Sequence, residues 1–392
     1  MTTTINNEHK KLNVPNLRFP EFQGEWEEYE LGDICDIITD FVAAGSFASL
    51  RENVKYYQEN NYAQLIRIID LKNNFTNSDF VYVDEVAYDF LWRVQLKEPN
   101  IVLPNIGANI GEKYYVKPQD LPKNKNVLGP NAILLRSKCN DTHFVYFRLS
   151  TSSYDNEMKK LVGASGQPKF NKTDLKKVSL FMPSLIEQKR IAYFLALLEE
   201  RIATQNKIID KLQSLIKGIA QKIVRSNKPN VRLYECVECS SSTQQESEVC
   251  EQGAYPVYGA NGIVGYLDDY NTEGEAVYII KDGSGVGTVS YVTGKCSATG
   301  TLNTLQAKDG YSLQYLYYLL KVFNFEPYKT GMAIPHIYFK DYGKAKVFCP
   351  SYTEQLQYAR LLSAIDSKLS VEKNTLRNLS LQKQYLLRQM FI

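Results

Sequence analysis

Three groups of residues have types and spacings that could support chemistry, and the first is a glycine-rich loop. The stretch YIIKDGSGVGTVSYV, from Tyr278, places this loop directly after a predicted strand, as nucleotide-binding loops do. Such a loop needs a following helix whose N-terminal amides face a phosphate. Here the chain continues as TVSYV, from Thr288, with the alternation of a strand, so we predict a tight turn or bulge. The sequence also lacks Gly-x-x-x-x-Gly-Lys-Ser/Thr, which excludes a P-loop ATPase.

The second group is a set of cysteines. Cys236, Cys239 and Cys250 could suggest zinc ligands, but a fourth ligand is missing nearby. The segment YECVEC aligns with YELGDI of the N-terminal part, and this places Cys236 and Cys239 opposite Leu31 and Ile34. Because those are apolar core positions, we expect small buried thiols rather than a metal site.

The third group is the histidines, which suggest neither a metal site nor a catalytic triad. His9, His143 and His336 are scattered along the chain. No Ser-His, Cys-His or paired-carboxylate constellation stands out, and there is no Asn-Pro-Pro-aromatic loop of the kind that holds a flipped adenine. We therefore expect no catalytic residues, no metal and no cofactor bound by this chain.

The elements that must position these loops are marked by a sequence that occurs twice. The chain runs PSLIEQKRIAYFLALLEERI in the middle and PSYTEQLQYARLLSAIDSKL near the C-terminus. In each copy the proline keeps the incoming chain extended, and the serine and glutamate form a capping box at a helix start. The residues concerned are Pro183, Ser184 and Glu187 in the first copy and Pro350, Ser351 and Glu354 in the second.

Both helices then carry an apolar stripe with the 3.5-residue period of a coiled coil. The first stripe comprises Ile191, Leu195, Leu198, Ile202, Gln205, Ile209, Leu212, Ile216, Ile219 and Ile223, and the second comprises Tyr358, Leu362, Ile365, Leu369, Glu372, Leu376, Leu379, Lys383, Leu386 and Met390. Helices of about 38 residues would run roughly 55–60 Å, which exceeds the width of a small domain. We therefore expect the two helices to pack on each other.

The repeat extends beyond the helices. IVLPNIGANIGEKYYV, from Ile101, aligns without a gap with VYIIKDGSGVGTVSYV, from Val277. PKFNKTDLKKVSLFMP aligns in the same way with PHIYFKDYGKAKVFCP, and the segments THFVYF and SLQYLY each predict a short helix start. The chain is thus two copies of one unit, a β-rich globular part followed by a long helix, in which the frame is kept and most other residues differ.

Length and composition set the limits of this interpretation. At 392 residues the chain is too long for one core, and we expect an arm over 1–28, globular domains over 29–183 and 229–350, and long helices over 184–228 and 351–392. No run approaches 18 apolar residues, so no membrane span is expected. Seven cysteines without a secretory signal indicate reduced thiols in the cytoplasm. The net charge of +3 does not by itself indicate whether the chain binds nucleic acid.

On these residues the chain resembles the specificity subunit of type I restriction-modification systems. The resemblance rests on LRFPEFQGEWEEYELGDI, on YPVYGANGIVGYLDDY and on the two Pro-Ser-x-x-Glu-Gln helix starts, and it covers essentially the whole chain. It implies an α+β fold, in which two β-rich mixed target recognition domains are joined by two long antiparallel coiled-coil helices. It also implies an internal pseudo-twofold repeat, with the helices as conserved spacers.

The resemblance also implies a function without catalysis. Each recognition domain would read one half of an asymmetric, bipartite site on double-stranded DNA, and the helices would fix the separation of the half-sites. The partners would be two modification subunits, which hold S-adenosylmethionine and methylate adenine. Two restriction subunits, which use ATP and Mg²⁺, can join them. The second globular domain carries more acidic than basic residues, so either its DNA-facing surface is locally basic or a partner supplies the charge.

Candidate DNA contacts lie on loops that are equivalent in the two copies and polar where the backbone turns. They are Asn105, Asn109, Lys169, Asn171 and Lys172 in the first copy and Lys281, Ser284, His336, Tyr338 and Lys340 in the second. Arg190 and Arg201, beside the apolar stripe, are candidates for partner contact.

Two other classes of protein remain as alternatives. A self-contained DNA methyltransferase or nuclease would need cofactor and catalytic loops that the sequence does not show. A coiled-coil adaptor without a nucleic-acid role would not explain why two globular domains share one arrangement of motifs while most of their other residues differ.

Overall fold

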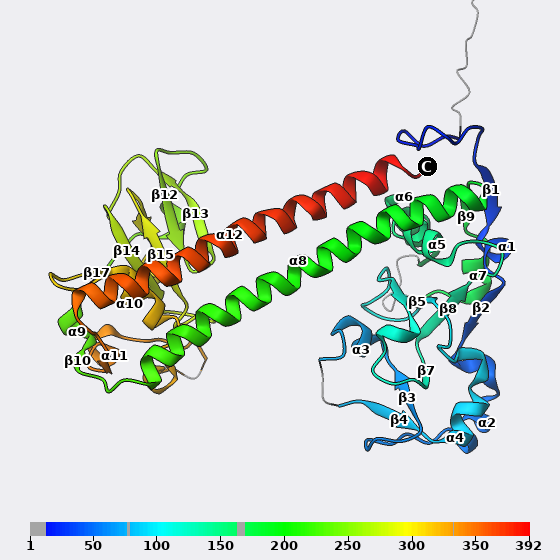
Figure 1. Cartoon of the computed structure of the whole chain (residues 1–392), viewed down its shortest axis with the longest axis horizontal. Helices are drawn as coiled ribbons and strands as arrows, with labels where there is room; N and C mark the ends of the chain where they lie inside the picture. The colour runs from blue at the N-terminus through cyan, green and yellow to red at the C-terminus, as the bar shows by residue number, and fades with distance from the viewer. Residues whose placement is uncertain (1–12, 77–78, 163–168, 332) are drawn as a thin grey trace, which may run out of the picture. The chain divides into compact units, whose positions relative to one another are not determined.

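A computed structural model describes residues 13–76, 79–162, 169–331 and 333–392 (Figure 1). The chain divides into two compact units: unit 1 comprises Met1–Ala203 and Arg377–Ile392, and unit 2 comprises Thr204–Leu376. Each unit therefore contains one β-rich domain and a part of each long helix. The expected spacer segments do not form a body of their own, because their apolar stripes are shared between the two units.

The described residues of unit 1 form three small sheets and seven α-helices before the first long helix. The strands are β1 (Glu27–Glu30), β2 (Ile37–Asp40), β3 (Ala63–Ile66), β4 (Val81–Val83), β5 (Asn100–Pro104), β6 (Tyr114–Val116), β7 (Asn126–Leu128), β8 (Ala132–Arg136) and β9 (Ser179–Met182). The helices are α1 (Leu31–Ile34), α2 (Phe47–Asn53), α3 (Ile68–Lys72), α4 (Glu85–Phe90), α5 (Thr142–Leu149), α6 (Ser152–Val162) and α7 (Lys172–Lys176). The sheets have the strand orders β1-β9, β2-β8-β5-β6 and β4-β3-β7.

Unit 2 has the same number of strands but fewer helices. The strands are β10 (Val231–Arg232), β11 (Val237–Ser241), β12 (Tyr255–Gly259), β13 (Gly262–Leu267), β14 (Glu275–Ile280), β15 (Val289–Thr293), β16 (Ser297–Ala298), β17 (Leu302–Ala307) and β18 (Lys346–Val347). The helices are α9 (Leu233–Cys236), α10 (Leu313–Leu320) and α11 (Phe339–Tyr342). The sheets have the orders β10-β18, β11-β17-β14-β15 and β13-β12-β16.

Every strand of unit 1 has a counterpart nine strands later in unit 2, in a sheet of the same order. The parallel pairs also correspond, since β3 pairs with β7 and β12 with β16. Ile101 lies opposite Tyr115 across β5 and β6, and Val277 lies opposite Tyr291 across β14 and β15. This register confirms the gap-free alignment of the two segments, and the internal repeat is a repeat of topology.

One part of the predicted alignment is wrong by three residues. Leu31 donates its backbone N–H to Val178, and the residue that makes the equivalent bond, to Ala345, is Leu233. Cys236 therefore corresponds to Ile34, whereas the sequence comparison placed it opposite Leu31. The tyrosines at the front of YELGDI and YECVEC misled that comparison. Cys236 is nonetheless fully buried, and its Sγ lies 3.8 Å from that of the buried Cys349.

The long helices are α8 (Leu185–Arg225) and α12 (Tyr352–Gln389), and they pack together within each unit (Figure 1). Every residue of both predicted stripes is buried or half-buried, which confirms the coiled-coil seam. In unit 1, Leu195 of α8 shares a core with Leu386 of α12, and in unit 2, Ile216 shares one with Leu369. The seam polar residues also meet: Gln205 Nε2 donates to the Glu372 backbone carbonyl at 3.1 Å and to its carboxylate.

The predicted capping boxes are only half formed, and a different half forms at each helix start. At α8, Ser184 Oγ accepts from the Glu187 N–H at 3.5 Å, while the Glu187 carboxylate turns to Arg18 at 2.7 Å. At α12, the Glu354 carboxylate accepts from the Ser351 N–H at 3.2 Å. The reciprocal arrangement fails at α8 because a buried cation competes for the glutamate.

Residues 13–28, which were expected to belong to an N-terminal arm, are packed into unit 1 instead. Residues 1–12 lie outside the described residues, but the chain from 13 onward is part of unit 1. Leu17 donates its N–H to the Gln389 carbonyl at 2.8 Å, and Trp26 is almost completely buried against Phe144 and Phe391. The polar composition of the segment hid this packing, to which Trp26, Phe19 and Arg18 contribute.

Candidate nucleic-acid interface

In each unit a tight loop, here called the turn loop, follows an inner strand of the four-stranded sheet. It comprises residues 105–112 after β5 and residues 281–288 after β14. Two glycines at equivalent positions take positive φ angles in both units: +83° and +98° at Gly107 and Gly111, and +94° and +90° at Gly283 and Gly287. Because the chain leaves each turn loop as a strand, the loop offers no helix N-terminus to a phosphate. This confirms the prediction of a turn.

A second segment, here called the return segment, lies beside each turn loop. It comprises residues 169–172 in unit 1 and 336–340 in unit 2. Phe170 donates its N–H to the Asn105 carbonyl at 3.2 Å, and Ile337 donates equivalently to Lys281 at 2.9 Å. The structure thus brings the two predicted groups of each copy together, although they are more than 50 residues apart in the sequence.

The turn-loop asparagines of unit 1 differ in their contacts. Asn105 is half-buried, and its Oδ1 is buried without a hydrogen-bond partner among the described residues. Asn109 Oδ1 accepts from Lys72 Nζ at 2.9 Å, and the same ammonium group pairs with Glu112 at 2.7 Å. Asn105 therefore has unused hydrogen-bonding capacity, whereas Asn109 is oriented by a neighbouring cation.

The return segment of unit 1 combines one exposed cation with two residues in structural roles. Lys169 is exposed. Asn171 is the N-cap of α7, because its side chain accepts from the Asp174 N–H at 2.9 Å. Lys172 Nζ lies 2.8 Å from Asp40 Oδ1 in an ion pair that is partly buried. Asn171 and Lys172 are thus explained by folding, and Lys169 is the stronger of the three candidates.

The two segments of unit 2 are joined by a side-chain pair that the sequence analysis did not identify. His336 Nδ1 lies 2.6 Å from Asp282 Oδ1, and about a third of each side chain is exposed. Lys281 is half-buried and Ser284 is exposed on the same turn loop. Asp282 could not be identified from the sequence because an acidic residue is not an expected contact for DNA. Its partner, His336, is also distant in the sequence.

The remaining candidates of unit 2 lie at the start of α11. Tyr338 is exposed and directly precedes the helix, and Lys340 Nζ lies 5.2 Å from the centre of its ring. Asn171 and Tyr338 precede equivalent helices, so Lys172 matches Phe339, as in the gap-free alignment of the two segments. Lys340 consequently has no lysine counterpart at its position, which is occupied by Thr173.

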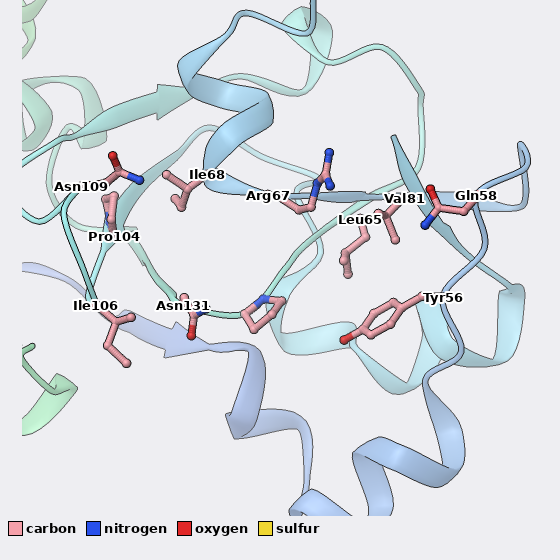
Figure 2. A pocket seen from close by; sticks show the side chains of 11 residues that line it. Tyr56, Gln58, Leu65, Arg67, Ile68, Val81, Pro104, Ile106, Asn109 and Asn131 are labelled. Carbon is pink, nitrogen blue, oxygen red and sulfur yellow. The ribbon is translucent and has the colours of Figure 1, made fainter. Parts of the chain in front are cut away.

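A cavity of about 440 Å³ adjoins the turn loop of unit 1 (Figure 2). It is lined by Tyr56, Gln58, Leu65, Arg67, Ile68, Val81, Pro104, Ile106, Asn109, Pro130 and Asn131. Arg67 is fixed there by two bonds to the buried Asp70, at 2.7 and 3.1 Å. Burial raises the pKa of the Tyr56 hydroxyl, which stays a hydrogen-bond donor at neutral pH. The turn loop thus stands beside an apolar hollow with a polar rim.

Two further residues were missed, although the repeated motif contains them. Gln188 and Gln355 end the two Pro-Ser-x-x-Glu-Gln motifs, and both are buried. Gln188 donates to the Pro183 carbonyl at 2.9 Å and accepts from the Asp141 N–H at 3.0 Å. Gln355 makes the same two contacts, to Pro350 and from Ser312, at 2.9 Å each. Each glutamine therefore joins a long helix to the N-cap of α5 or α10.

The part of the chain that the structure describes has neither a metal-binding cluster nor a membrane-spanning helix. In the ranges 13–76, 79–162, 169–331 and 333–392, no group of three or more His, Cys, Asp or Glu side chains could hold a metal ion. Within the same ranges, no helix is both long enough and apolar enough to cross a bilayer.

Comparison with known proteins gives relatives over most of the chain. The chain is 25% identical over 291 residues to the putative type I restriction enzyme MjaX specificity subunit of Methanocaldococcus jannaschii, a match that spans 72% of this chain and 64% of the relative. It is 27% identical over 117 residues to the type I restriction enzyme EcoprrI specificity subunit of Escherichia coli, spanning 30% of this chain and 29% of the relative. These matches thus span less than two thirds of either relative.

Solved structures and the family profile extend the comparison to nearly the full length. The S subunit of a type I restriction-modification system from M. genitalium superimposes with a TM-score of 0.66 at 18% identity, covering 97% of this chain and 99% of that one. A chain from a study of complex assembly in a type I system gives a TM-score of 0.51 at 14% identity, covering 93% and 97%. The profile described as the type I restriction modification DNA specificity domain matches residues 23–214 and 230–380. The chain therefore belongs to the family of type I restriction-modification DNA specificity subunits.

Proposed function

We propose that this chain is the non-catalytic DNA-recognition subunit of a type I restriction-modification complex. Each β-rich domain reads one half of a bipartite target, and the target is asymmetric because the two domains carry different side chains. The observation that carries this proposal is the duplication of all nine strands, with turn loops of equal backbone geometry but different composition. Two domains with the same fold but different loop residues are suited to recognising two different DNA sequences.

The candidate contacts divide between the two recognition domains. In the first domain, Lys169 is the candidate for phosphate contact because it is exposed. Asn105 is the weaker candidate, for a base edge, because the residue is half-buried and its side-chain oxygen is buried. In the second, Lys281, Ser284, His336, Tyr338 and Lys340 are the candidates. Asn109 has its carbonyl oxygen bound by Lys72 and keeps its amide N–H groups for DNA.

The helices α8 and α12 are proposed to set the half-site separation and to dock two modification subunits. Apolar side chains opposite the seam support this docking, because Ile186 and Tyr193 on α8 and Leu381 and Tyr385 on α12 are exposed. Arg201 is exposed and remains a candidate for partner contact. Arg190 is a weaker one, because its Nε lies 3.7 Å from Glu21 and its guanidinium covers the Phe19 ring.

Chemistry is assigned to the partner subunits. S-adenosylmethionine belongs to the two modification subunits, and ATP with Mg²⁺ belongs to restriction subunits, where these join the complex. The target is double-stranded DNA and the site of action is the cytoplasm. This assignment follows the family to which the chain belongs.

Adenine methylation across the genome tests the proposal. The full chain is expressed with its cognate modification subunits, and methylated adenines are mapped with and without this chain. We expect one asymmetric, bipartite sequence to be methylated only when the chain is present. Methylation that is unchanged by the chain would exclude a specificity role and would favour an adaptor.

The separation of the half-sites can be tested in the same assay. Insertion of one heptad into each helix, beside Gln205 and Glu372, keeps the seam in phase and adds about 10 Å. The gap between half-sites should then grow by about three base pairs, while both half-sites keep their sequences. An unchanged gap in a stably folded variant would show that the helices do not set the spacing.

A further inference from the structure

The turn loop and the return segment meet at one point that is geometrically equivalent in the two units. An isolated β-bridge joins Ile106 to Lys169 in unit 1 and Asp282 to His336 in unit 2. The flanking backbone bonds correspond as well, since Asn105 and Lys281 accept from Phe170 and Ile337. The bridge and this flanking bond are thus the same in both copies. The side chains differ, because Ile106 and Lys169 of unit 1 are replaced by Asp282 and His336 in unit 2.

In unit 2 this position is built to hold one ring in one orientation. The His336 backbone bonds to Thr330 in both directions, at 2.8 and 2.9 Å, while Gly283 donates to the preceding Pro335 carbonyl at 3.0 Å. Gly331, at φ +88°, allows the ring to lie close, because a Cβ there would come within 3.2 Å of His336 Cδ2. The Asp282 carboxylate then fixes the ring through Nδ1 at 2.6 Å.

This geometry decides which ring atom is available to a ligand. A carboxylate facing Nδ1 requires the proton to be on that nitrogen. In the neutral ring Nε2 is then a hydrogen-bond acceptor, and no group among residues 13–76, 79–162, 169–331 and 333–392 is hydrogen-bonded to it. In the major groove, such an acceptor is complementary to the exocyclic amino group of adenine or cytosine.

The equivalent position of unit 1 has the opposite chemistry. Ile106 is 39% exposed and forms one wall of the cavity beside the turn loop (Figure 2). Lys169 is exposed beside it and is a hydrogen-bond donor only. A donor next to an apolar surface is complementary to the acceptor edge of guanine or to thymine, whose groove edge carries a carbonyl and a methyl group.

We propose that these bridge pairs are specificity-determining residues, at which Asp282 and His336 select an adenine or cytosine amino group and Ile106 and Lys169 select guanine or thymine. His336 contacts the base, and Asp282 is a positioning residue that acts through it. This inference rests on the proposed function and adds which residues discriminate between bases and what class of base each pair accepts.

The test exchanges the pairs in the full chain, expressed with its cognate modification subunits. The double variant Asp282→Ile with His336→Lys transfers the unit 1 pair to unit 2, and methylated adenines are mapped as before. One base of one half-site should change from adenine or cytosine to guanine or thymine, and the other half-site should stay unchanged. The reverse exchange, Ile106→Asp with Lys169→His, should alter the other half-site instead.

Single substitutions separate recognition from folding. His336→Ala should lower methylation of the native target by about tenfold or more, the loss expected for one specific base contact. Asp282→Asn should weaken discrimination at that same base, and Asp309→Asn, the same change at an exposed position outside both segments, is the matched control. Thermal unfolding of each variant should match the native chain, because both members of the pair are partly exposed.

The outcomes distinguish the two levels of the proposal. If all variants fold and methylate the native target at the native rate, the bridge pairs do not determine specificity, although the chain still directs methylation. If a pair exchange alters methylation at every sequence equally, the pair contributes affinity alone and the inference is wrong. If the native chain directs no methylation, the proposed function itself is wrong.

Discussion

The two starts of the long helices have the same motif but solve different problems. In unit 1, Glu187 is almost fully buried, and its carboxylate binds Arg18 while lying 3.4 Å from Trp26 Nε1. In unit 2, the equivalent Glu354 is exposed and caps its own helix through Ser351. The two glutamates thus occupy equivalent positions in the fold but contribute differently to stability. The difference arises from the neighbouring residues, because Arg18 and Trp26 contact Glu187.

Substitution of these two glutamates should give the largest difference between the units in lost unfolding free energy. Glu187→Gln leaves the Arg18 guanidinium without its anion in a site that is only 13% exposed. Breaking a buried ion pair in this way should cost about 3 kcal/mol of unfolding free energy. Glu354→Gln removes a solvated cap and should cost about 1 kcal/mol or less. Urea unfolding measures both costs. Tryptophan fluorescence reports on unit 1, which contains both tryptophans, and far-UV circular dichroism reports on the whole chain, so a change confined to unit 2 appears in the second signal alone.

The neighbouring glutamines provide the matched control. Gln188→Leu and Gln355→Leu each leave a buried N–H and a buried carbonyl unpaired, so each should cost about 1–3 kcal/mol of unfolding free energy. The cost should be slightly larger at Gln188, which also donates to Asn140 Oδ1 at 2.9 Å. Equal costs at the two glutamates, or a larger cost at Gln355 than at Gln188, would contradict this account of the two helix starts.

A smaller difference is expected between equivalent glycines of the turn loops. Gly111 and Gly287 both have positive φ, so alanine at either position should cost about 1–2 kcal/mol in backbone strain. A Cβ at Gly111 meets nothing within 4 Å, but at Gly287 it lies 3.0 Å from the buried Phe325 side chain. Overpacking should add about 1–3 kcal/mol to the cost of Gly287→Ala.

Urea unfolding of the two alanine variants checks this comparison. The control is the same glycine substitution in a Phe325→Ala background, which lacks the ring atoms that lie 3.1 and 3.2 Å from the added Cβ. Gly287→Ala should cost less in that background than in the native chain. If Gly111→Ala destabilises unit 1 as much as Gly287→Ala destabilises unit 2, packing against Phe325 does not limit this position.

The features that could be predicted from the sequence are those that recur with a fixed spacing. The seam from Ile191 to Ile223 was identifiable because a coiled coil imposes one period on the sequence of each helix. The turn loops were identifiable because glycine recurs where the backbone needs a positive φ. Both signals are local, and a second copy in the chain made each of them stronger.

The features that could not be predicted depend on contacts between distant segments. Nothing near Arg18 in the sequence indicates that it will meet Glu187, and the bond between Asp282 and His336 joins residues separated by several strands. The cavity beside Ile106 is likewise assembled from several loops and strands. The short helices α1 and α9 were misaligned because two tyrosines matched by chance. Their register is set by the preceding strands β1 and β10, which pair with β9 and β18.

The seam of the two long helices allows a direct comparison of two equivalent residues, because Gln205 and Glu372 occupy equivalent positions and also contact each other. They differ by one chemical group, an amide against a carboxylate. Hydrogen bonds from Lys368, at 2.5 Å, and from Gln205 lower the pKa of the Glu372 carboxyl below its ordinary value of 4.5. A buried polar pair at a seam position is the feature that commonly fixes the register of a coiled coil.

The smallest expected effect is a change in how the stability of the chain depends on pH when Glu372 is substituted. Because the folded pKa of Glu372 is depressed, its stabilisation is present above the unfolded pKa and is lost as pH falls through the folded value. Urea midpoints measured from about pH 6 to pH 3 should fall less steeply for Glu372→Gln than for the native chain. Glu200→Gln, which removes one exposed charge from α8, is the control. If Glu372→Gln and the native chain lose stability in parallel over this range, the carboxylate is not stabilised by its partners, and the amide and carboxylate are interchangeable at the seam.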